Sequence, residues 1–194
     1  MNAMSEIEKD FSGVLSAIDA VNIEDPNKTK IEEIEYPNEL LYSVRMTGIL
    51  EEYYPEAGEL LIIAARGQHI KRWAIAREEY PEGRIGYLQW RKELTKLHCT
   101  ELSQIMKDNG YGPEDIEIVE QLLNKRNLKT DQKSQILQDV VSIVFLKYYA
   151  LDFVGKHADK DIQSIMGKML KKMSPEGVSF AKENSPQAIA EALS

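Results

Sequence analysis

The feature that most constrains the fold is an apolar run in the last third of the chain, Val140–Leu146. It reads V-V-S-I-V-F-L and lies inside a segment, about residues 131–155, whose pattern is typical of a long helix. A helix that is apolar on every side is usually central to its fold, because every side must be covered. The run is far shorter than the roughly 18 residues needed to cross a bilayer. The segment therefore predicts a helical fold built around it, with no membrane association.

Apolar residues at helical spacing predict further helices and almost no strands. The expected helices cover about residues 5–22, 38–54, 56–70, 86–109, 113–126, 131–155 and 158–173, with a short one after Ser185-Pro186. Residues 28–37 are interpreted as a charged, extended strap, and 71–85 as a loop rich in bases and aromatics. No linker is long enough to divide domains. We therefore expect a single all-α domain over 1–194, with an N-terminal helix and strap at 5–37, a core at about 38–150 and C-terminal helices at 158–193.

The charge of the chain is unevenly distributed. The formal net charge is -8, but residues 61–98 carry 8 bases against 4 acids, whereas residues 1–60 carry 4 bases against 14 acids. The whole chain is too acidic for general nucleic-acid binding. A local basic segment in an acidic protein suits a small anion such as a phosphate or a nucleotide. The alternative is that these charges are solvated and paired with nearby partners.

The cysteine content and the N-terminal sequence bear on the compartment. Cys99 is the only cysteine, so an internal disulfide and a zinc finger are excluded, and a reducing compartment fits. The first residues lack a basic region followed by an apolar one, which is the pattern of a secretory signal. We therefore expect a cytoplasmic protein.

A polar cluster directly follows an apolar helix in the middle of the chain. Residues 64–73 read A-A-R-G-Q-H-I-K-R-W and come after L-L-I-I. Burying such polar and ionisable groups costs several kcal/mol unless they gain partners or a ligand. The cluster is therefore the leading candidate for a functional site.

Four segments resemble the motifs of the HD-domain superfamily of metal-dependent phosphohydrolases. Residues 42–46, Y-S-V-R-M, are similar to its H-S-L-R-V motif, and residues 64–72, A-A-R-G-Q-H-I-K-R, match A-A-L-L-H-D-I-G-K in length. Residues 98–111 resemble H-P-E-I-G-A-E-I-L-R-E-L-G-Y, and residues 138–141, Q-D-V-V, resemble Q-D-A-D. The order and spacing of these segments imply an HD-domain-like architecture over about 38–150.

The resemblance implies where a metal would be held. The superfamily's ligand positions are occupied here by Tyr42, Gln68, His69 and Asp139, of which Tyr42 and Gln68 are poor ligands. His69, His98 and Asp139 are the candidate catalytic and metal-binding residues, if the fold brings them together. Such a site would hold a divalent metal (Mn, Mg, Co, Fe or Zn) and hydrolyse a phosphoester.

Each of these three residues also has a structural interpretation. His69 is then a hydrogen-bonded core residue, and His98 is a partly buried helix residue. Asp139 is then held by an ion pair, for example with Arg45, or by a hydrogen-bond network, which is the interpretation we favour.

Arginines and aromatics around the polar cluster predict an anion-binding pocket. Arginine presents forked donors to phosphate oxygens, and aromatic rings stack on bases. The candidate anion-binding residues are Arg45, Arg66, Arg72, Arg77, Arg84 and Arg91, and the candidate stacking residues are Trp73, Tyr87 and Trp90. In the alternative interpretation the tryptophans fix the loop to the core, and the arginines pair with nearby glutamates.

Over nearly its full length the chain also resembles the domain of unknown function 4202 family. The resemblance is carried by R-G-Q-H-I-K-R-W, Y-P-E-G-R-I-G-Y-L-Q-W-R and N-L-K-T-D. Some members carry a glutamyl-tRNA-synthetase-like label, but the nucleotide motifs of such enzymes are absent here. The leading hypothesis is a pocket for a phosphorylated small molecule or nucleotide, with or without metal-assisted hydrolysis. The alternative is a non-catalytic ligand-binding or protein-interaction module, for example a homodimer, that has lost the metal site.

Overall fold

The computed structural model describes residues 8–125, 128, 130–156 and 162–193 and is mostly helical, with 72% helix and 5% strand. Among these residues no helix is long and apolar enough to span a membrane. Residues 5–7, 126 and 158–161 of the expected helices lie outside the described part. The contacts divide the chain into two compact units: a first unit of Met1–Thr47 and Gly58–Asn124, and a second unit of Gly48–Ala57 and Lys125–Ser194. One boundary falls inside a helix, α2 (Asn38–Tyr53), so no linker marks it in the sequence.

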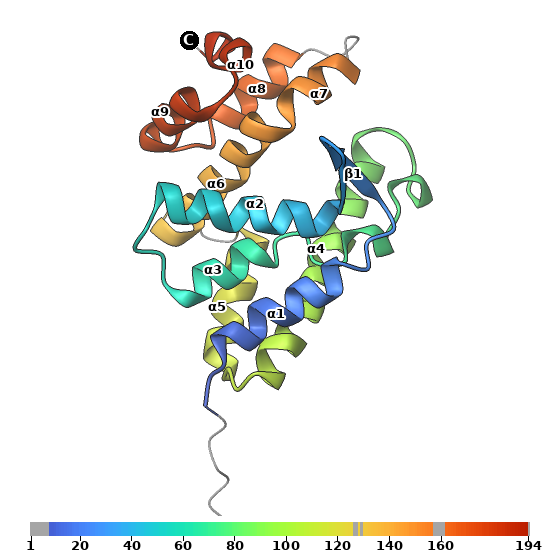
Figure 1. Cartoon of the computed structure of the whole chain (residues 1–194), viewed down its shortest axis with the longest axis vertical. Helices are drawn as coiled ribbons and strands as arrows, with labels where there is room; N and C mark the ends of the chain where they lie inside the picture. Colours follow the sequence, from blue (N-terminus) through green and yellow to red (C-terminus); the bar gives the residue numbers. More distant parts are fainter. Residues whose placement is uncertain (1–7, 126–127, 129, 157–161, 194) are drawn as a thin grey trace, which may run out of the picture. The chain divides into compact units, whose positions relative to one another are not determined.

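The first unit is a helical layer with one small hairpin (Figure 1). Helix α3 packs against α1 and α5, and α4 packs against the same two helices. Its apolar core includes Val14, Ile18 and Ile63, none of which is exposed. Besides the first part of α2, its elements are α1 (Phe11–Asn22), β1 (Lys28–Ile31), β2 (Ile34–Pro37), α3 (Glu59–Arg66), the 3-10 turns η1 (Arg72–Ala74) and η2 (Arg77–Glu79), α4 (Gly83–Asp108) and α5 (Pro113–Asn124).

The charged strap expected at residues 28–37 is a two-stranded antiparallel hairpin. Lys28 pairs with Pro37 and Ile31 with Ile34, which leaves a two-residue reversal between the strands. Glu32 adopts the left-handed conformation, with φ 54°, that such a reversal demands. Because no glycine or asparagine marks the turn, the usual hairpin signal is missing from the sequence.

Helix α3 ends four residues earlier than the sequence predicted. It stops at Arg66, and Gly67 follows as its C-cap. The chain then turns, and Lys71 takes a left-handed conformation with φ 56°. Its backbone N–H donates to Oδ1 of the buried Asn22, at 3.1 Å. The polar cluster therefore lies on a turn that is fixed to α1, and not on the helix itself.

Helix α4 buries one narrow stripe of side chains. Its buried face is made of residues spaced four apart, which return to the same side of a helix. They are Trp90, Leu94, His98, Leu102 and Met106. A histidine therefore occupies the middle of an apolar stripe, where it is screened from water.

The second unit is built around α6, as the apolar run predicted. Val140, Ile143 and Val144 on α6 are fully buried. Helix α6 packs against α7 and α9, and α9 packs against α10 (Figure 1). Besides the end of α2, the helices of this unit are α6 (Gln132–Tyr148), α7 (Ala150–Lys156), α8 (Ile162–Leu170), α9 (Pro175–Asn184) and α10 (Gln187–Ala192).

Two boundaries in the second unit differ from the prediction. The single helix expected at 131–155 is interrupted at Tyr149, where α6 ends and α7 follows. Helix α9 was not predicted at all. It begins with Ser174 as N-cap and Pro175 in its first turn, a pairing that favours a helix start.

Candidate functional site

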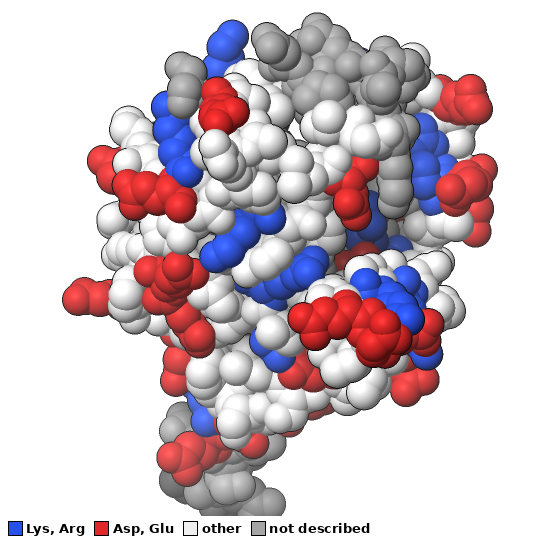
Figure 2. All heavy atoms as spheres, turned by 45° about the horizontal axis from the view of Figure 1, so that its top comes forward, with Lys and Arg blue, Asp and Glu red and all other residues white. Residues whose placement is uncertain are grey.

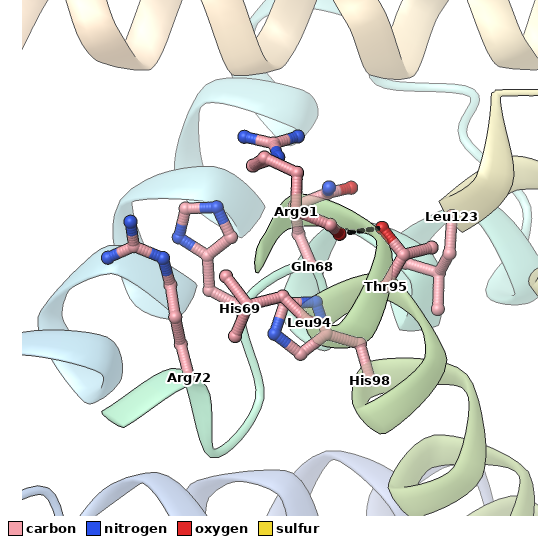
Figure 3. Close-up of a pocket in the computed structure, with 8 residues that line it drawn as sticks. All are labelled: Gln68, His69, Arg72, Arg91, Leu94, Thr95, His98 and Leu123. Atoms are coloured by element: carbon pink, nitrogen blue, oxygen red, sulfur yellow. Dashed lines mark hydrogen bonds between the residues drawn. The ribbon is translucent and has the colours of Figure 1, made fainter. Parts of the chain in front are cut away.

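A small polar cavity lies in the first unit, where the turn after α3 meets α4. The turn supplies Gln68 and His69, η1 supplies Arg72, and α4 supplies most of the rest (Figure 3). The lining residues are Gln68, His69, Arg72, Arg91, Leu94, Thr95, His98 and Leu123. The cavity volume is about 10 Å³. That is room for about one water molecule, or for one oxygen atom of a larger ligand.

His69 is held between α2 and α4. Its ring stacks on Tyr42, with centroids 4.0 Å apart and planes 11° apart. Its Nδ1 lies 3.4 Å from Oε2 of Glu39. On the α4 side, the ring centroid of His98 is 6.0 Å away. The structure thus brings the two candidate histidines together beside one carboxylate.

Glu39 is a member of this site that the sequence analysis missed. It lies in the first turn of α2 and is only 7% exposed. Its backbone N–H donates to Oδ2 of Asp25 at 3.0 Å, which fixes the start of the helix. Burial raises the pKa of Glu39 to about 7, and the nearby Arg72 only partly opposes this. Its charge is therefore incompletely compensated in the folded protein.

Arg72 connects Glu39 to the aromatic residues of α4. Its Nη1 lies 3.4 Å from Oε1 of Glu39, and its guanidinium lies 4.9 Å from the ring centroid of Trp90. Trp90 is 7% exposed and donates its indole N–H to the carbonyl of Ile75 at 3.0 Å. One face of the indole is thus occupied by Arg72, and the ring fixes the loop after η1. Trp90 has the structural role that the alternative interpretation gave it.

Two buried side chains of the cavity have polar atoms without a hydrogen-bond partner among the described residues. They are Oε1 of Gln68, which is 6% exposed, and Nε2 of His98, which is 5% exposed. Burial, with smaller contributions from His69, Arg72 and Arg91, lowers the pKa of His98 to about 2. His98 is therefore neutral near pH 7. Buried polar atoms of this kind normally have a partner. A group that donates is expected at Oε1 of Gln68, and a water, which both donates and accepts, could serve either atom.

The six candidate arginines do not form one cluster. Only Arg72 and Arg91 line the cavity. Arg66 instead forms a forked ion pair with Asp19 of α1, with nitrogen–oxygen distances of 2.8 and 2.5 Å. Arg45, on α2, is not among the lining residues. Two of the six candidate arginines therefore line the cavity, and the sequence did not indicate which two.

The remaining arginines belong to the loop and to the start of α4. Arg77 donates to the carbonyls of Tyr80 and Pro81, at 2.9 and 3.1 Å, and so folds its own loop. Arg84 is exposed near the start of α4. On the face drawn in Figure 2, Lys and Arg side chains occur in separate groups beside Asp and Glu. Several bases of residues 61–98, such as Arg66 and Arg77, therefore already have partners within the protein.

The candidate stacking residues lie around the cavity but do not line it. Tyr87 is 44% exposed, and its ring centroid is 5.9 Å from that of Trp90. Trp73, in η1, is half-buried. Of the three residues, Tyr87 is the most exposed to solvent.

The sequence was compared with protein families, with curated proteins and with solved structures. A family model described as a domain of unknown function, DUF4202, matches residues 12–193. The chain belongs to the DUF4202 family. The comparisons with curated proteins and with solved structures gave no match.

Asp139 of this DUF4202 protein belongs to the second unit, whereas His69 and His98 belong to the first. Its carboxylate accepts hydrogen bonds from the backbone N–H and the hydroxyl of Ser174, at 2.9 and 2.6 Å. The amide of Gln135 at 3.0 Å and the hydroxyl of Tyr53 at 3.2 Å complete the network. Asp139 is therefore held by the hydrogen-bond network that the sequence analysis favoured, and it anchors the start of α9.

The described residues do not form a metal centre. No group of three His, Cys, Asp or Glu side chains among them is arranged to hold an ion. The ring of Tyr42 is stacked on His69, and Gln68 turns its amide toward the cavity. A standard catalytic site needs at least three good donors. The residues present therefore do not fit the metal that the HD resemblance implied.

Two partners in these networks were missed because they are distant in the sequence. Glu39 precedes His69 by 30 residues, and Ser174 follows Asp139 by 35. A signal existed for each. Glu39 lies in the first turn of a helix after a proline, where an acid is favoured, and Ser174 precedes a proline, as an N-cap often does. Neither signal identifies the partner.

Proposed function

We propose that this DUF4202 protein binds a small phosphorylated molecule, by its phosphoryl group, at the cavity of the first unit. One observation carries the proposal. Arg72 and Arg91 line the same small cavity as Gln68 and His98, each of which has a buried polar atom without a partner among the described residues. Forked cationic donors match phosphoryl oxygens, and such an oxygen would also accept a hydrogen bond from Nε2 of His98. Oε1 of Gln68 is an acceptor, so its partner would be a donor such as a water or a ligand hydroxyl.

The size of the cavity defines how such a ligand is held. A volume of about 10 Å³ admits one oxygen, so the phosphoryl group enters end-on. Its other oxygens then lie toward Arg72, whose side chain is 34% exposed, and toward Arg91. No carboxylate among the described residues lies within ion-pair distance of Arg91, so its charge is available to an anion. The rest of the molecule points to solvent, where Tyr87 has an open ring.

The proposal assigns the anion to this cavity and not to the larger one in the second unit. The second cavity, of about 590 Å³, is lined by Asp131, Asp139 and Glu176, and no lysine or arginine of the described part of the chain lines it. Carboxylates at that density repel a phosphate. Size alone therefore favours the second cavity, whereas charge favours the first.

The proposed function is binding, on a helical scaffold similar to that of the HD-domain superfamily. The segment that resembles its second motif, residues 64–72, contains Gln68, His69 and Arg72, all of which line the cavity. The described residues do not assemble the donors for a metal, so the proposal is for binding without metal-assisted hydrolysis. The alternative, a protein-interaction module, predicts that no phosphorylated ligand binds.

The test compares two arginines of α4. Binding of inorganic phosphate, AMP, ADP and the singly charged dimethyl phosphate is measured by titration calorimetry for the wild type, Arg91→Gln and Arg84→Gln. Arg84 is on the same helix but outside the cavity, so it controls for the loss of one surface charge. We expect Arg91→Gln to weaken binding about tenfold or more, since a charge-assisted hydrogen bond contributes roughly 1.5–3 kcal/mol.

Two outcomes would contradict the proposal. If the wild type binds none of these ligands, the cavity is not a phosphate site and the interaction module is favoured. If Arg91→Gln and Arg84→Gln weaken binding equally, the effect is one of overall charge and the ligand lies elsewhere. Unchanged melting temperatures of both variants without ligand show that the fold is intact.

A further inference from the structure

Glu39 places a carboxylate beside Arg72, one of the two arginines that line the cavity. Its two carboxylate oxygens are 3.4 Å from Arg72 Nη1 and 3.4 Å from His69 Nδ1. Both distances are longer than the 2.7–2.9 Å typical of charge-assisted hydrogen bonds. Arg72 therefore keeps donor capacity for a ligand, while the ligand must approach a guanidinium that already faces a carboxylate.

The charges around the cavity sum to a small positive value. Arg72 and Arg91 contribute two positive charges, Glu39 contributes one negative charge when ionised, and His98 is neutral. The sum is +1 when His69, which also lines the cavity, is unprotonated. The carboxylate of Asp25 lies behind Glu39, where it accepts the backbone N–H groups of Glu39 and Asn27. It lowers the local potential further. A site with a net charge of +1 neutralises one negative charge of the ligand and leaves a second negative charge uncompensated.

We propose that Glu39 makes the cavity selective for phosphoryl groups that carry a single negative charge, such as phosphodiesters, over doubly charged phosphomonoesters. This inference rests on the proposed function. A second ligand charge gains little from the two arginines once one of them is shared with Glu39, and it is repelled by the buried carboxylate. At the short distances inside a protein, one such repulsion changes a binding constant by about tenfold or more.

The test measures a preference and not an affinity alone. Dimethyl phosphate carries one charge, and methyl phosphate carries two at pH 8, because its second pKa is about 6. The ratio of their dissociation constants is measured by titration calorimetry for the wild type and Glu39→Gln. We expect the wild type to prefer dimethyl phosphate, and Glu39→Gln to shift the ratio about tenfold or more toward methyl phosphate.

A second carboxylate of the same unit provides the matched control. Glu101 is half-buried on α4 and forms an ion pair with Lys71 at 2.8 Å, outside the cavity. Glu101→Gln removes one negative charge without touching Arg72, so the ratio is expected to stay at the wild-type value. If Glu39→Gln does not fold, Glu39→Met removes the same charge at similar length and replaces it in the comparison.

The outcomes separate this inference from the function on which it rests. If neither probe binds the wild type or the variants, the phosphate site itself is refuted, and the inference with it. If both probes bind and the ratio is the same in the wild type and Glu39→Gln, the site stands and the selectivity by Glu39 is overturned. An equal shift in Glu101→Gln also overturns it, because the effect is then one of overall charge.

Discussion

Glu39 and His98 are predicted to give the first unit opposing pH dependences that cancel in the wild type. The pKa of His98 falls from 6.5 to about 2 on folding because the ring is buried. Below pH 6.5 the unfolded chain therefore binds a proton that the folded chain does not, and stability is lost as pH falls. The pKa of Glu39 rises from 4.5 to about 7. Between these values the folded chain binds the extra proton, and stability is gained as pH falls.

The magnitude follows from the size of each shift. A fully shifted group changes the free energy of unfolding by about 1.4 kcal/mol per pH unit. From pH 6.5 to 4.5 His98 therefore costs about 2.7 kcal/mol, and Glu39 returns about the same amount. When one of the two groups is removed, the free energy of unfolding changes with pH as the other group dictates. Glu39→Gln is expected to lose stability as pH falls through this window, and His98→Leu to gain it.

The assay is urea unfolding at a series of pH values, followed by tryptophan fluorescence. Both tryptophans, Trp73 and Trp90, lie in the first unit, so the signal reports on that unit alone. Other carboxylates titrate equally in all the proteins and cancel in the differences between variant and wild type. The double variant is expected to follow the wild-type profile. If the profiles of both single variants run parallel to that of the wild type from pH 6.5 to 4.5, the buried charges are not as we describe them.

Three further predictions concern packing and loop anchoring. Gly177→Ala should destabilise the second unit by about 1–3 kcal/mol, because a Cβ there would lie 2.6 Å from the carboxyl carbon of Asp139. Gly167→Ala is the control and should not destabilise the unit, because its Cβ would meet nothing within 4 Å. Both are measured by urea unfolding followed by circular dichroism. Arg66→Met, which breaks the forked ion pair with α1, should cost the first unit about 2 kcal/mol by tryptophan fluorescence. Trp90→Phe loses the hydrogen bond to the loop after η1, so tryptic cleavage after residue 77 should become faster.

The sequence predicted the helices well where their signals are local. The apolar pattern placed α2, α4 and α5, and the start of α6, within a few residues, since helical periodicity and caps act over one or two turns. The hairpin at residues 28–37 was missed because its turn has Glu32 in a left-handed conformation. A glycine at that position would have indicated a turn. The division into two units was hidden because one boundary lies inside α2.

The candidate site was predicted in part. The polar cluster at residues 64–73 identified Gln68, His69 and Arg72, because ionisable groups after an apolar helix need partners wherever they lie. The partners themselves were not predictable. Six arginines of similar composition divided into cavity, ion-pair and loop roles according to which carboxylate or carbonyl the fold brought near each of them.

The sequence by itself determined that this chain is helical, where most helices lie, and which turn concentrates its polar side chains. These properties depend on neighbours within about two helical turns. Only the tertiary structure decided that Glu39 lies beside His69 and Arg72, and that Asp139 accepts a hydrogen bond from Ser174. Such contacts join residues about 30 or more positions apart. Their selection depends on how whole helices pack and on how much water that packing excludes, which no local pattern records.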